Sequence, residues 1–301
     1  MITLTDERGL IFSPKSWAEI EEIPGYVKGI DPKKHKLKAI IGSYHLKDVH
    51  CGLSCNSPHD KGYIAQTQSG AVTNIGHICG KNYFGVDFTT FANQHNREVT
   101  AKSHRDLLST FSLQLDDLEN EVSQLRHSEF GLDWIYKTSK ELINRGGGCP
   151  DEVVKAVRVM VKSRSIVLKK ERAANEDEIK AYALANAKPL KYVEETMANI
   201  YGLEVLFEEN DLKKLVIDDV LENIKLFKNL TIDDLIYSEL IRWAKWVSSL
   251  EGVKEKIQNS MSAGLSLLTQ TNLEPFTKII SKSEDSKLFA KFLKKLPSAS
   301  S

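Results

Sequence analysis

The stretch HCGLSCNSPHDKGYIAQTQSGAVTNIGHICGKNYFG, His50 to Gly85, concentrates the residue types that bind metals. It holds three of the four cysteines and three of the eight histidines of the 301-residue chain. A cysteine in a protein core acts as a small apolar residue and needs neither histidines nor glycine-rich turns around it. The clustering therefore favours a metal site over a group of buried thiols with unrelated surface histidines.

Two pairs of candidate ligands frame this stretch. Cys51 and Cys55 lie four positions apart, and His77 and Cys79 lie two apart on the far side of a predicted hairpin. Zinc binds four cysteine or histidine donors in a tetrahedron. The sequence therefore predicts a Zn²⁺ site made by Cys51, Cys55, His77 and Cys79. His59, four residues after Cys55, is the alternative to His77 as the fourth ligand.

A turn with ligands, then a hairpin, then ligands near the start of a helix resembles the treble-clef group of zinc folds. The spacings differ from the usual C-x2-C pairs, so the resemblance implies a fold element and no particular function. Four protein ligands would close the coordination shell, and neither H-E-x-x-H nor the zinc-deaminase pattern is present. We therefore expect a structural zinc that contributes on the order of 10 kcal/mol to folding.

The first 90 or so residues differ in style from the rest of the chain. Glycine and proline are dense there, which is typical of short elements joined by turns. Strands are predicted at 36–46, 61–68 and 71–76, with a hairpin turn around Gly70. From about Asp87 the apolar spacing becomes helical. We predict a mainly α-helical protein with an N-terminal α+β zinc-binding module (1–92), a helical connector (93–148) and a helical domain (149–301).

The connector carries an apolar seam with the 3-4 spacing of a coiled coil. Such a seam pairs two chains or packs inside one, so it predicts either a homodimer through 108–125 or one helix of an intramolecular hairpin. Glycines and a proline in NRGGGCP, 144–150, break the helical pattern after it. The seam residues are Leu108, Phe111, Leu115, Leu118, Val122 and Leu125.

Charge is balanced, with 41 Lys and Arg against 41 Asp and Glu, so any surface for nucleic acid must be a local patch. Two clusters are candidates for contacts with phosphates, one before the first long strand and one along the predicted helix after Pro150. Lys81, beside the metal ligands, is a further candidate. The first cluster is Lys33, Lys34, Lys36 and Lys38; the second is Lys155, Arg158, Lys162 and Lys169.

These patterns favour a binding protein without enzymatic activity. One hypothesis is that the zinc module and the basic helix stripe bind DNA. The alternative is a protein–protein adaptor or inhibitor whose helical domain binds a partner while zinc is purely structural. Cys149 at a helix N-terminus would favour a thiolate, but no motif supplies a base for it. With no secretion signal and no long apolar run, we expect a cytoplasmic protein without a membrane partner.

Overall fold

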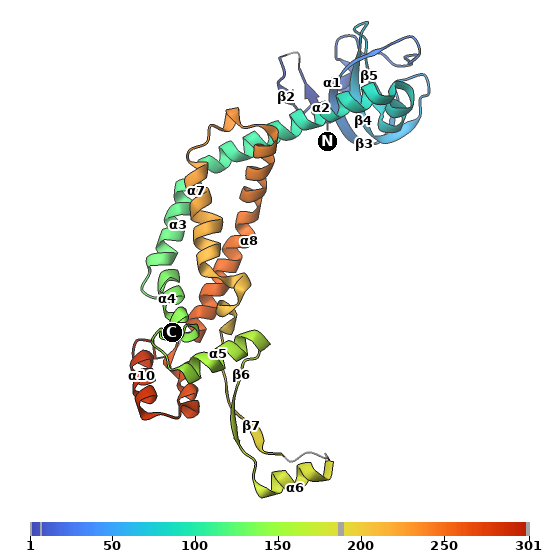
Figure 1. The fold of residues 1–301 in the computed structure, drawn as a ribbon. Coiled ribbons are helices and arrows are strands. Elements are labelled where there is room, and N and C mark those ends of the chain that lie inside the picture. Colours follow the sequence, from blue (N-terminus) through green and yellow to red (C-terminus); the bar gives the residue numbers. More distant parts are fainter. Residues whose placement is uncertain (1, 7, 186–189, 299–301) are drawn as a thin grey trace. The chain divides into compact units, whose positions relative to one another are not determined.

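The computed structural model describes residues 2–6, 8–185 and 190–298. Two compact units make up the chain: the first unit combines 1–111 with 231–247, and the second unit combines 112–230 with 248–301. The chain is mostly helical with a small antiparallel sheet near its N-terminus, as predicted (Figure 1). Among the described residues we find no helix whose length and hydropathy suit it to crossing a bilayer.

The first unit is built on a five-stranded antiparallel sheet in the order β2-β1-β3-β4-β5. Its long central strands and the β4–β5 hairpin were predicted, and Gly70 in the turn has a φ of +88° that favours glycine. The short first two strands were not predicted. The strands are β1 (Ile2–Thr5), β2 (Ile11–Phe12), β3 (Leu37–His50), β4 (Pro58–Thr67) and β5 (Val72–Gly76).

Two helices cover different apolar clusters of this sheet. Ile20 of α1 (Trp17–Glu21) packs in one cluster with Ile64, while Phe88 of α2 (His77–Ser112) packs in another with Ala65. Neighbouring residues of one strand point to opposite faces, so Ile64 and Ala65 separate the two clusters. Full burial of a side chain such as Ile64 contributes about 1.5–3 kcal/mol, which stabilises the sheet that carries the site.

Helix α2 continues well beyond the sheet, with non-helical backbone at Gly85 (φ 54°, ψ −122°). Near its C-terminal end it contacts the residues that lead into α8 (Tyr237–Leu267). Arg105 donates to the Leu235 carbonyl at 3.2 Å, and the rings of Phe111 and Trp246 lie edge to face at 5.5 Å. The first unit is therefore formed by two parts of the chain that are distant in sequence. The boundary predicted at residue 92 falls inside α2.

The second unit is a set of helices that pack largely in sequence order. Helix α3 packs on α4, and α4 packs on α5. Phe289 and Phe292 of α10 are fully buried and stack together, with Phe276 beside them. The remaining helices are α3 (Leu115–His127), α4 (Leu132–Ile143), α5 (Asp151–Ser163), α6 (Glu176–Ala185), α7 (Glu222–Phe227), α9 (Gln270–Leu273) and α10 (Ser283–Leu293). Short 3-10 segments occur at Leu203–Leu206, Glu208–Asn210, Ile232–Asp234 and Glu274–Ile279, and a π-helical segment at Lys214–Leu221.

The predicted apolar seam is divided between two helices. Its first part lies on α2 and its second on α3, and the chain turns at Leu113 and Gln114 between them. Leu113 in the turn is 84% exposed, whereas Leu108, Leu118 and the other seam residues except the half-buried Leu125 are buried within the single chain. This burial supports the intramolecular alternative; a homodimer through 108–125 remains a prediction.

The helical region that was predicted to run on past Pro150 is interrupted. Helix α5 begins after Pro150, as predicted, and ends at Arg164, whose φ of 51° is left-handed. An antiparallel hairpin follows, formed by β6 (Val167–Ala173) and β7 (Tyr192–Asn199), with α6 between its strands (Figure 1). The predicted helical domain therefore also contains a β-hairpin, because the left-handed residue stops α5 and the segment after it pairs with β7.

Candidate metal centre

Cys51 and Cys55 lie on the loop that joins β3 to β4. The backbone N–H of Cys51 donates to the Ser57 carbonyl at 2.9 Å, and that of Gly52 donates to the Asn74 carbonyl at 2.8 Å. A Cβ at Gly52 would lie 2.1 Å from the Thr73 hydroxyl oxygen, so only glycine lets this loop approach β5 so closely. These contacts hold both thiols against the end of the sheet.

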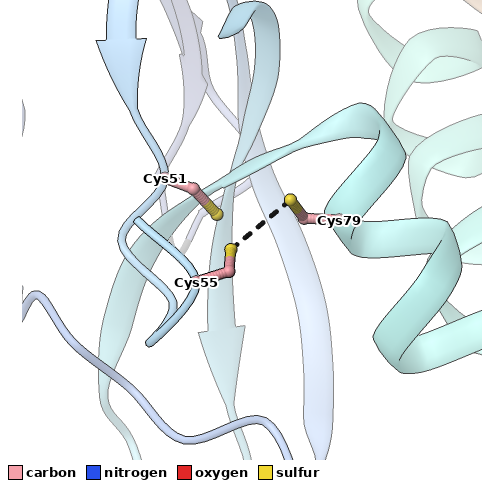
Figure 2. A group of neighbouring side chains, drawn as sticks. All are labelled: Cys51, Cys55 and Cys79. Atoms are coloured by element: carbon pink, nitrogen blue, oxygen red, sulfur yellow. Dashed lines mark hydrogen bonds between the residues drawn. The ribbon is translucent and has the colours of Figure 1, made fainter. Parts of the chain in front are cut away.

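Cys79 reaches the same place from the first turn of α2, which follows β5 directly. Figure 2 shows the three sulfur atoms turned toward one another, and they all lie within 4.8 Å of each other. Cys55 Sγ donates to Cys79 Sγ at 3.5 Å. Cys51 is buried, whereas Cys55 and Cys79 are half-buried. The predicted convergence of three cysteines from two distant turns is confirmed, and these three thiols can hold a metal ion.

Burial and hydrogen bonding shift the pKa values of the three thiols in different directions. Burial raises the pKa of Cys51 and raises that of Cys79 to about 12. Burial also acts to raise the pKa of Cys55, but hydrogen bonds that its thiolate form accepts from the Ser57 backbone and from Cys79 outweigh burial, so the pKa is lowered. A thiol binds a metal ion as its thiolate, so an ion held here would displace the protons.

Neither predicted histidine ligand belongs to the sulfur cluster. Within the described part of the chain, the only ligand atoms found in the 4.8 Å group are the three sulfurs. His77 is exposed at the start of α2, and its ring lies 6.1 Å from those of both Tyr63 and Phe88. His59 Nδ1 donates to the Ser57 carbonyl at 3.1 Å, and its Nε2 is hydrogen-bonded to Tyr44 Oη at 2.6 Å. A four-ligand site with His77 or His59 remains a prediction.

A buried polar network supports the site from behind. The Asn74 side chain is fully buried; its amide donates to the His50 carbonyl at 2.8 Å and to Tyr44 Oη at 3.2 Å. Tyr26 Oη donates to Asn74 Oδ1 at 2.9 Å. A buried polar group is costly without a hydrogen-bond partner, so this network fixes the strands next to the thiols. Sequence reasoning missed Asn74, although a lone asparagine inside the apolar strand AVTNIG was a signal.

A cleft of about 1060 Å³ opens beside the thiols. Its walls come from the facing parts of β3 and β4 and from the first turns of α2. Cys55 and Cys79 line it, together with the polar side chains of Asp60, Lys61 and Asn82. Concave sites of this size accommodate small ligands. The cluster is therefore reachable from one side.

The predicted cationic residues are distributed over both units. Lys33, Lys34, Lys36 and Lys38 are all exposed, as is Lys81 in the first turns of α2. In the second unit, Lys155, Arg158 and Lys162 share one side of α5 and line a cleft of about 180 Å³. Lys169 does not belong to that stripe, because it lies on β6 and pairs with Glu194 at 2.7 Å. Its assignment to the helix was wrong.

Arg145 and Cys149 lie in the segment between α4 and α5. Arg145, between α4 and α5, also lines the small cationic cleft and was missed because it follows the end of the helical pattern. Cys149 is buried, and burial raises its pKa to about 12, so a thiolate is disfavoured there despite the following helix.

The chain was compared with models of protein families, with curated proteins and with solved structures, and no match was found.

Proposed function

We propose that the protein binds nucleic acid through the cationic cleft on α5. The observation that carries this proposal is the composition of the cleft: four exposed cations, Arg145, Lys155, Arg158 and Lys162, line it with Val154 and Val159. No carboxylate of the described chain is among these lining residues. A local patch of this kind can attract phosphates although the chain has no net charge.

The geometry of the patch suits a phosphate backbone. Lys155 and Lys162 are seven residues apart, which is about 10.5 Å along a helix. That distance is about three times the 3.4 Å axial spacing of successive phosphates on one strand of DNA. Arg158 Nε donates to the Ile143 carbonyl at 2.7 Å, so the guanidinium is held in place at the C-terminal end of α4. A pre-positioned cation of this kind loses less conformational entropy on binding.

We propose that the ion of the metal centre is Zn²⁺. Thiolates are soft donors, and zinc in proteins is commonly bound by such donors. In this proposal the ion stabilises the first unit, which presents the exposed lysines just before and at the start of β3. Elemental analysis of protein purified without added metal or chelator would give one zinc per chain; another metal, or none, would refute the assignment.

A salt titration tests the nucleic-acid proposal. Fluorescence anisotropy with a labelled DNA duplex would measure affinity between 50 and 200 mM salt. For three phosphate contacts, the slope of log K against log salt is about −2.7, so affinity falls roughly 40-fold over that range. The triple variant Lys155→Gln, Arg158→Gln and Lys162→Gln should lose this component.

The matched control removes the same number of charges elsewhere in the second unit. Lys180, Lys213 and Lys214 are exposed and lie outside the cleft, so changing all three to Gln should leave the slope nearly unchanged. Equal losses in the two triple variants would mean that only overall charge matters. No binding of the wild-type chain at 50 mM salt would overturn the proposal.

A further inference from the structure

The metal centre and the large cleft beside it share two residues. Cys55 and Cys79 line the cleft, whereas Cys51 is 2% exposed and reaches the cluster from the protein interior. An ion held by the three sulfurs would thus have protein on the Cys51 side and the cleft on the other. We infer that this ion keeps one coordination position open to the cleft and takes there an exchangeable, neutral nitrogen ligand carried on a planar ring.

Two of the protein's own donors that line the cleft already have hydrogen-bond partners, and the exposed His77 lies outside the group of three sulfurs. His59 uses both ring nitrogens, with Tyr44 Oη and the Ser57 carbonyl, and a Cβ at Gly76 would lie only 2.9 Å from its ring. To bind the ion, His59 would have to give up at least one of these hydrogen bonds. The Asp60 carboxylate accepts from the Asp48 N–H at 3.2 Å. Among the described residues, the ligand atoms that lie within 4.8 Å of one another are the three sulfurs.

Charge selects the kind of ligand. Three thiolates around a divalent ion carry a net charge of −1, and a further anion would raise it to −2 in a partly buried place. Repulsion between like charges is strongest where solvent is excluded, so a neutral donor is favoured. Water is such a neutral donor when no other ligand is bound. A neutral ring nitrogen is another, and its ring also contacts the walls of the cleft.

The walls of the cleft suit a flat ring. Tyr44, Tyr63 and Tyr83 contribute aromatic side chains, and Lys61 and Asn82 contribute polar ones. Aromatic pairs add about 0.5–1.5 kcal/mol beyond the area they bury. Zinc sites with three protein ligands and one exchangeable position are those that bind or activate small molecules, in contrast to closed structural sites. This inference rests on the proposed metal centre and is independent of nucleic-acid binding.

Cobalt substitution tests the inference directly. Co²⁺ replaces Zn²⁺ in tetrahedral sites, and its visible absorption reports the ligand set. The full-length chain would be loaded with one equivalent of Co²⁺ and titrated with imidazole as the probe. We expect a saturable change in the absorption bands while the protein retains its cobalt, measured by elemental analysis after gel filtration. Tyr83→Ala should raise the Kd for imidazole roughly 2- to 12-fold.

Variants of the two histidines and of one cysteine complete the design. His59→Ala and His77→Ala should keep the cobalt spectrum and its response to imidazole, as should the control Cys149→Ser outside the cluster. The inference would be overturned if the cobalt spectrum did not change when imidazole is added. It would also be overturned if the spectrum of His59→Ala or His77→Ala were that of a site with one ligand fewer. Either result would indicate a closed site. Failure to bind Co²⁺ would overturn both the metal centre and the open position, while leaving the salt titration with DNA unaffected.

Discussion

Removal of the Asn74 side chain should destabilise the sheet that carries the thiols. In Asn74→Ala, the His50 carbonyl loses its amide donor at 2.8 Å and Tyr26 Oη loses its acceptor at 2.9 Å. Tyr44 Oη keeps its partner His59, so it adds little to the cost. Each orphaned polar group costs about 1–3 kcal/mol. Two such groups give an expected loss of about 2–6 kcal/mol.

The two compact units make global unfolding hard to assign, so a local readout is preferable. Hydrogen exchange of peptides from β3, β4 and β5, followed by mass spectrometry, gives the opening free energy of the sheet alone. Tyr26→Phe serves as the matched control, because it keeps the ring and orphans one group, Asn74 Oδ1, instead of two; it should cost about 1–3 kcal/mol. The reasoning fails if Asn74→Ala lowers the opening free energy by less than 1 kcal/mol, or by no more than Tyr26→Phe.

Three other outcomes are expected. Cys55→Ser should abolish stoichiometric metal binding while Cys149→Ser keeps it, as measured by elemental analysis, because only the first thiol belongs to the cluster; equal metal content in both would contradict this. Burial raises the pKa of Tyr26 to about 12, so the sheet should lose stability as pH rises from about 10 to 12, and Tyr26→Phe should reduce that loss in exchange measurements. Burial lowers the pKa of His95 below 6.5, and both of its ring nitrogens lack hydrogen-bond partners among the described residues. Stability should therefore fall as pH drops through 6.5, where the unfolded imidazole binds a proton that the folded one rejects. His95→Leu should flatten that dependence and raise stability by about 1 kcal/mol in urea titrations; an unchanged pH profile would refute it.

Local patterns predicted the parts of the fold that local physics decides. The turn at Gly70 needs a positive φ, and the helix break before Pro150 follows from three glycines and the proline ring. The convergence of Cys51, Cys55 and Cys79 also followed, since the hairpin between the two ligand pairs brings its ends together. In each case a few neighbouring residues determine the geometry.

The missed features depend on contacts that the sequence does not encode locally. Arg164 ends α5 in a left-handed conformation that non-glycine residues rarely adopt, so nothing marked the change from helix to the β6–β7 hairpin. Lys169 was placed on the wrong element for the same reason. The seam residues are mostly buried, as an apolar seam predicts. The turn of the chain at Leu113 could not be predicted, because the 3-4 spacing of apolar residues continues from α2 into α3. That His59 lies outside the sulfur cluster could not be predicted, because it depends on a side-chain partner, Tyr44, to which His59 is hydrogen-bonded.

The first unit has a consequence for the order of events during synthesis. Its α2 helix is completed by residue 112, yet Trp246, which packs on Phe111, is translated only after the whole 112–230 segment. On the ribosome, the Phe111 ring must wait for its partner while more than a hundred intervening residues emerge. The sheet and its thiols, complete at Cys79, can form long before that. The nascent chain therefore acquires its metal-binding part first and finishes the unit around it last.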